Sequence, residues 1–180
     1  MAILPWILIG CAATALLLWG LGILATLRHT SRAPFDVPSD DLPAISLLKP
    51  IRGLEESLEA NLRSFYEQDY PAPIEIVFST TERDDPGLAA ARRLAAQYPQ
   101  VTTRFVISDP GFGLNPKVAN LAGARGAATH DLVLQSDANV RVRPDYVRRV
   151  VSELLAEDAQ QLSSMVTRVG ERSVGAQMDN

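Results

Sequence analysis

An uninterrupted apolar stretch near the start of the chain constrains its folding more than any other sequence feature. Residues 3–27 (ILPWILIGCAATALLLWGLGILATL) carry no charged side chain. As an α-helix they would exceed the roughly 30 Å hydrocarbon core of a bilayer. A cleaved signal peptide would have a basic n-region and a shorter apolar stretch, whereas Met1 and Ala2 carry no basic side chain. We therefore expect a transmembrane helix over 3–27.

The residues around this stretch predict its orientation. Arg28, His29 and Arg32 follow it, and no basic side chain precedes it. The positive-inside rule then places the N-terminus outside and everything after Arg28 in the cytoplasm. The single cysteine, Cys11, lies within the stretch, so no intramolecular disulfide can form.

Composition argues against a nucleic-acid partner and against a zinc site. The formal charge of -4 argues against nucleic acid as a partner. His29 and His130 are far apart in the sequence and outside any ligand-spaced cluster, which argues against zinc. A metal in this chain is therefore expected to be held by oxygen.

Beyond a Pro-, Ser- and Asp-rich linker at 28–43, we expect an α/β domain over 44–180. Short apolar runs predict strands at 44–48, 74–79, 101–107 and 131–136. Between and after them, apolar side chains recur at helical spacing: Leu54, Leu58, Leu62 and Phe65; Leu88, Ala91, Leu94 and Tyr98; Val118, Leu121 and Ala122; Val147, Val150, Val151, Leu154 and Leu155. Residues 161–170 are a candidate for one more strand. This alternation predicts a mainly parallel sheet with helices on both faces and ligands at the carboxyl ends of the strands.

Three of these helices are expected to begin with proline, at Asp85-Pro86, Asn115-Pro116 and Arg143-Pro144. Helix capping and ligand binding explain such Asp-Pro and Asn-Pro pairs equally well. Capping leaves Asp84 unexplained, because one helix does not need a second carboxylate. An acid at a strand end can bind the ribose or base of a nucleotide.

Of the 17 lysine and arginine residues, only two are lysines, Lys49 and Lys117. Lys117 lies in the first turn of an expected helix, where a cation opposes the helix dipole at a cost of roughly 0.3–1 kcal/mol. A bound anion would relieve this cost, and the loop GFGLNPK (111–117) has the glycines and helix start of a phosphate site. Lys49 is either a second anion-binding residue or a solvated loop charge.

Asp137 and Asn139 follow the last apolar run, in LVLQSDANV (132–140). Because side chains alternate along a strand, their oxygens can point the same way and suit Mg²⁺ or Mn²⁺. The alternative is an Asx turn that closes the strand.

Taken in order, several motifs resemble the family-2 and ceramide-glucosyltransferase-like (family 21) glycosyltransferases, and the bacterial hopanoid-biosynthesis members most of all. They are KPIRG (49–53), EANLRSFYEQDYP (59–71), DDP (84–86), GLNPKVANL (113–121) and SDANVRVRPDY (136–146). The resemblance covers about 45–174.

The resemblance implies a GT-A fold, a UDP-sugar donor, a lipid acceptor, inversion at the anomeric carbon and a place in the bacterial inner membrane. It identifies Asp84 or Asp85 with the uridine-binding acid and Asp137 with the first acid of the metal-binding DxD motif. Asn139 departs from that motif. Lys49 and Lys117 fall in motifs that line the donor site.

The family's catalytic-base aspartate, its Q-x-x-R-W segment and its C-terminal membrane helices would lie beyond Asn180, so we expect a donor-binding region without an assignable catalytic base. Two other functions remain open: a catalytically inactive, membrane-tethered nucleotide-sugar-binding subunit, and a family-2 enzyme acting on a polyprenyl phosphate or a polysaccharide.

Overall fold

The computed structural model describes residues 3–33, 35, 37–109, 111, 115–164 and 166. The chain divides into two compact units, Met1–Pro34 and Phe35–Asn180. The first consists of α1 (Ile3–Thr30), whose large apolar side chains are exposed. By length and composition, the stretch Ile3–His29 could cross a membrane.

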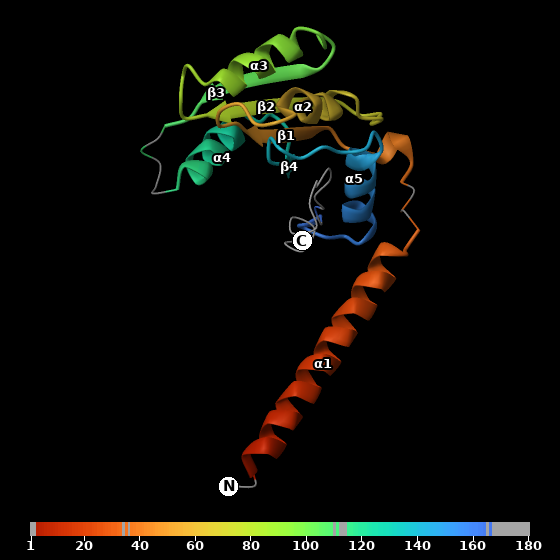
Figure 1. Ribbon diagram of the computed structural model, residues 1–180. Coiled ribbons are helices and arrows are strands. Elements are labelled where there is room, and N and C mark those ends of the chain that lie inside the picture. The colour runs from red at the N-terminus through yellow and green to blue at the C-terminus, as the bar shows by residue number, and fades with distance from the viewer. Residues whose placement is uncertain are drawn as a thin grey trace. The chain divides into compact units, whose positions relative to one another are not determined.

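The second unit has the expected alternation of strands and helices (Figure 1). All four predicted strands are confirmed. The elements are β1 (Ile45–Pro50), α2 (Leu58–Tyr66), β2 (Ile74–Thr80), α3 (Pro86–Ala95), β3 (Thr102–Ile107), α4 (Pro116–Ala127), β4 (Leu132–Gln135) and α5 (Tyr146–Ala156). Leu42, next to a short 3-10 helix at Ser39–Asp41, is already buried, so packing begins just before Ala44.

The four strands form one parallel sheet in the order β3-β2-β1-β4. The chain moves outward from β1 to β2 and β3, and then returns to pair β4 with the other side of β1. This reversal creates a topological switch point between β1 and β4, and parallel sheets bind ligands outside the carboxyl ends of such strands.

The two faces of the sheet have different cores. The larger core joins one face to apolar side chains of α2, α3 and α5, among them Leu62, Leu94 and Val151. The smaller core joins Leu48 and Val77 to Ala124 of α4. Helices on both faces therefore cover the sheet, as predicted.

Two sequence expectations about where helices begin were wrong. Leu54 precedes α2 and is 65% exposed, because Ser57 has a positive φ of 63° and the helix starts only after it. Helix α5 starts at Tyr146, two residues beyond Pro144. The described part of 161–170, which is 161–164 and 166, contains no strand.

Helix α4 buries a face of small residues and not the predicted one. Val118 is 48% exposed, whereas Ala119 and Ala124 are buried. The cause is close packing: a Cβ at Gly123 would lie 2.1 Å from the hydroxyl oxygen of Ser108, just beyond β3. A larger side chain on this face would push α4 off the sheet.

A buried carboxylate connects the amino ends of the strands. Glu75 of β2 accepts hydrogen bonds from Ser46 (2.7 Å), Arg104 (2.5 Å) and the main-chain N–H of Thr129 (2.9 Å). Burial alone would raise the pKa of Glu75, but these bonds outweigh it and lower the pKa from 4.5 to about 2. Glu75 therefore joins β1, β3 and the segment that leads into β4.

We expect Glu75→Gln to lower the free energy of unfolding at pH 7 by about 2 kcal/mol, because charged hydrogen bonds are lost in a buried place. The lowered folded-state pKa means that the carboxylate's contribution is complete above about pH 4.5 and disappears as the pH falls toward about 2. Urea unfolding of the full chain in detergent at several pH values measures both effects. The control is Glu59→Gln, which changes an exposed pair with Arg63 and should have little effect.

Candidate functional site

Polar groups gather where β1 and β4 end side by side at the switch point. Lys49 is near the end of β1, and Ser136 and Asp137 follow β4 directly. The N–H of Ser136 donates to Leu48 O at 3.1 Å, which continues the β1–β4 ladder by one bond beyond the strand. The two strand ends are thus held in register.

Lys49 approaches this site from inside the core. Its side chain is 1% exposed, and its Nζ lies 3.5 Å from the centroid of the Phe65 ring. The Nζ donates to Asp137 O at 2.7 Å and to Ser136 Oγ at 3.2 Å. Burial lowers the pKa of Lys49 from 10.5 to about 7, although the Asp137 carboxylate opposes this shift.

Asp137 begins a turn and does not continue the strand. Strand β4 ends at Gln135, and the N–H of Val140 donates to Asp137 O at 3.3 Å. The expectation that Asp137 and Asn139 share a strand face by alternation is therefore wrong, because both lie in the turn 137–140. Asn139 is exposed there, and Asp137 is half-buried.

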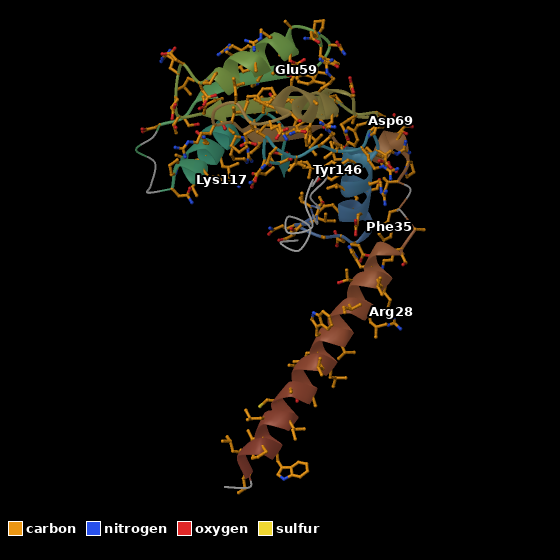
Figure 2. The ribbon with its side chains drawn as sticks, in the orientation of Figure 1. Arg28, Phe35, Glu59, Asp69, Lys117 and Tyr146 are labelled. Carbon is orange, nitrogen blue, oxygen red and sulfur yellow. The ribbon has the colours of Figure 1, made fainter. Side chains whose placement is uncertain are left out.

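Lys117 pairs with the Asp137 carboxylate. Its Nζ lies 2.9 Å from Oδ1 and 3.0 Å from Oδ2, and both side chains are about half exposed, at 51% and 45%. Lys117 lies in the first turn of α4 (Figure 2), which Asn115 caps by accepting from the N–H of Lys117 at 2.9 Å. In this structure the anion that pairs with Lys117 is the Asp137 carboxylate. Of the predicted phosphate loop 111–117, residues 112–114 lie outside the described residues.

Asp85 is committed to holding the backbone. Its Oδ1 accepts from the N–H groups of Gly87 (2.7 Å) and Leu88 (3.1 Å), and its Oδ2 accepts from Gly53 (2.7 Å). Gly53 has a positive φ of 69°, and a Cβ at Gly87 would meet Gly53 O at 2.2 Å. Asp85 therefore caps α3 and fixes the loop after β1. The neighbouring Asp84 is exposed in the turn between β2 and α3.

The donor set around Asp137 fits a hard divalent ion. Both carboxylate oxygens already face a cation, the ammonium of Lys117, and Asn139 offers an amide oxygen in the same turn. Within the described residues, no three His, Cys, Asp or Glu side chains form a metal cluster. Mg²⁺ and Mn²⁺ sites with one or two protein ligands fill their other positions with water and substrate phosphate.

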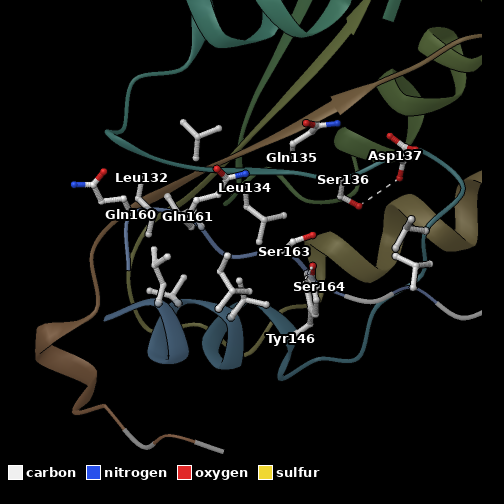
Figure 3. Close-up of a pocket in the computed structure, with 18 of the residues that line it drawn as sticks. Leu132, Leu134, Gln135, Ser136, Asp137, Tyr146, Gln160, Gln161, Ser163 and Ser164 are labelled. Carbon is white, nitrogen blue, oxygen red and sulfur yellow. Dashed lines mark hydrogen bonds between the residues drawn. The ribbon is translucent and has the colours of Figure 1, made fainter. Parts of the chain in front are cut away.

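A cavity of about 580 Å³ extends from this site along β4. Its walls come from β4, α5 and residues 160–164 and 166, and they include Leu134, Tyr146 and Leu154. Ser136 and Asp137 lie at one end of the row of β4 side chains (Figure 3). Leu132, Val133 and Leu134 of the strand line the rest of the cavity, together with the polar side chains of Gln160 and Gln161.

Sequence reasoning missed two parts of the site. Ser136 shares the Lys49 amino group with Asp137, and Phe65 forms the floor beneath that group. The apolar residues that precede Ser136 in the sequence could have indicated that its hydroxyl group is buried. Nothing in the sequence paired Phe65 with Lys49, because that contact depends on how α2 packs.

The family model for glycosyl transferase family 21 matches residues 5–180. The chain belongs to glycosyltransferase family 21. It is 31% identical over 121 residues to ceramide glucosyltransferase 1 of Caenorhabditis elegans, with 67% of this chain and 26% of the relative covered. It is 34% identical over 131 residues to the ceramide glucosyltransferase of Komagataella phaffii, with 71% and 25% covered. The chain thus spans about a quarter of these relatives.

The fold has a solved counterpart in a mannosyltransferase, PcManGT from Pyrobaculum calidifontis, determined in complex with GDP-Man and Mn²⁺. The two chains superpose with a TM-score of 0.54 at 24% identity, covering 76% of this chain and 40% of the other. This similarity, together with the parallel sheet, confirms the predicted GT-A-like fold.

Adjacent acids provide a matched test of this site. We expect Asp85→Ala to destabilise the chain by about 2 kcal/mol, near the upper end for a lost N-cap, because the loop at Gly53 also loses its acceptor. Asp84→Ala changes an exposed side chain and should alter the free energy of unfolding by less than about 0.5 kcal/mol. Thermal unfolding by circular dichroism compares the two; equal losses would contradict this division.

Proposed function

We propose that this chain forms the donor-binding part of a membrane-anchored, inverting glycosyltransferase that transfers a sugar from a UDP-sugar to a lipid acceptor. The observation that carries the proposal is the pairing of Lys117 with Asp137 at the switch point of a family 21 chain. A half-exposed cation and acid of this kind can separate, so that the acid binds a metal ion and the cation binds the diphosphate. The acceptor is a ceramide- or hopanoid-like lipid.

Asp137 would hold the Mg²⁺ or Mn²⁺ ion, and Asn139 would assist with its amide oxygen. A divalent ion in such a place neutralises the diphosphate and stabilises it as a leaving group. Lys117 would turn from Asp137 toward the phosphate oxygens once the carboxylate has another cation. The start of α4 beneath Lys117 adds a further favourable field for an anion.

The remaining acid at the strand ends would select the nucleoside. Asp84 is free of the capping bonds that occupy Asp85, and its exposed carboxylate can accept from the N–H of a uracil ring or from ribose hydroxyls. Lys49 and Asp85 then support the donor site from within the fold. We assign no described residue as the catalytic base.

Helix α1 would anchor the enzyme in the bacterial inner membrane. Arg28 in its last turn and Arg32 just after it favour the cytoplasmic side for the domain that follows. A lipid acceptor is itself confined to a membrane, so an anchored donor domain keeps both substrates at one surface.

Titration of the detergent-solubilised full chain tests the proposal. We expect UDP-glucose with Mn²⁺ to give binding heat and to raise the melting temperature, and GDP-mannose to bind at least tenfold more weakly. Asp137→Ala should abolish the Mn²⁺-dependent part, because the ion loses the carboxylate proposed to hold it. The matched control is Asp131→Ala, an exposed aspartate at the opposite end of β4. Absence of any heat or stabilisation with the unmodified chain would overturn the proposal.

The proposed role of Asp84 has a separate readout. Asp84→Asn should weaken UDP binding about tenfold, the effect of losing one charged hydrogen bond of roughly 1.4 kcal/mol, and leave the Mn²⁺ dependence intact. Isothermal titration with UDP at fixed Mn²⁺ measures this. Unchanged affinity would remove Asp84 from the donor site.

A further inference from the structure

We infer that Lys49 is a positioning residue for the proposed ion: from inside the core, its amino group holds the turn 137–140 that carries both candidate ligands. The inference rests on the proposed metal site at Asp137. It gives Lys49 a different role from the donor contact expected from the sequence.

A single carbonyl oxygen carries this link. Asp137 O accepts from Lys49 Nζ at 2.7 Å and from the N–H of Val140 at 3.3 Å. The second bond closes the turn, and the first ties it to β1. Asn139 lies within that closed turn. The Lys49 contact therefore fixes the backbone that carries both candidate ligands, Asp137 and Asn139.

The surroundings of the Lys49 amino group leave it no route to a ligand. Besides Asp137 O, it donates to Ser136 Oγ at 3.2 Å, and the Phe65 ring lies 3.5 Å away. The side chain is 1% exposed. An amino group so enclosed can act on a bound ion only through the groups that it holds.

The anchor beneath the turn is rigid. Strand β1 is hydrogen-bonded to β2 on one side and to β4 on the other, and the bond from Ser136 N to Leu48 O extends the second ladder to the foot of the turn. Lys49 then adds the next contact, at Asp137. Regular pairing and the lysine together leave little freedom to the main chain of Asp137.

Lys117 and Lys49 thus contact different groups of the same residue, Asp137. Lys117 binds the half-exposed carboxylate of Asp137, and Lys49 binds its main-chain carbonyl. Lysine suits the inner position because its amino group is a compact donor on a narrow stem, whereas the planar fork of arginine needs more room. This accounts for a lysine at position 49 in a chain that otherwise prefers arginine.

Lys49→Met tests the inference, because methionine fills similar space and removes the donor. We expect the Kd for Mn²⁺ in the presence of UDP, measured by electron paramagnetic resonance of free Mn²⁺, to rise at least tenfold. We also expect faster hydrogen exchange at the Val140 amide, with unchanged exchange in β2 and β3. The matched control is Leu47→Val, on the same strand and facing the same core. It should lower stability and leave the Kd unchanged.

The outcomes separate this inference from the proposed function. Equal Mn²⁺ affinity of Lys49→Met and the unmodified chain overturns the positioning role and leaves the metal site standing. If the unmodified chain shows no Mn²⁺ binding that Asp137→Ala removes, the proposed function fails, and Val140 exchange alone then decides whether Lys49 holds the turn. Should Lys49→Met not fold, Lys49→Gln replaces it, because its shorter side chain keeps a polar end and does not reach the carbonyl.

Discussion

The pairing of β1 with β4 is the constraint on which the rest of the site depends. These strands are separated in the sequence by β2, β3 and three helices, and only the return of the chain across the sheet brings them together. Their joined ends place Lys49 beneath Asp137. If another strand lay beside β1, Lys49 and Asp137 would not be in contact.

This arrangement requires a lysine in the apolar core, which is unfavourable by itself. Burial lowers the pKa of Lys49 to about 7, so its amino group loses much of its preference for carrying a proton. Two oxygen acceptors and an aromatic ring compensate for the lost water. The amino group of Lys49 is unfavourable to bury, and its hydrogen bond to Asp137 O helps to fix the position of the turn after β4.

Buried contacts to the backbone and exposed charges are carried by different residues throughout the site. Asp85 holds main-chain N–H groups, and its neighbour Asp84 is exposed. Lys49 holds a main-chain carbonyl, and Lys117 meets a half-exposed carboxylate. The buried member of each pair holds the main chain close to the more exposed member.

Patterns within short segments determined much of this protein from the sequence alone. Alternating apolar runs and helical faces predicted the four strands and the parallel sheet, because burial imposes those periods directly. The ordered motifs led to the correct family. The sequence indicated that helix capping leaves one of the two acids, Asp84, unexplained, and the structure then showed that Asp85 accepts the capping bonds. What only the tertiary structure decided concerns contacts between distant segments: that Asp137 starts a turn, that Lys117 pairs with it, and that Lys49 points inward. Those outcomes depend on strand order and on the packing of α2 and α4 against the sheet, and no local periodicity encodes them.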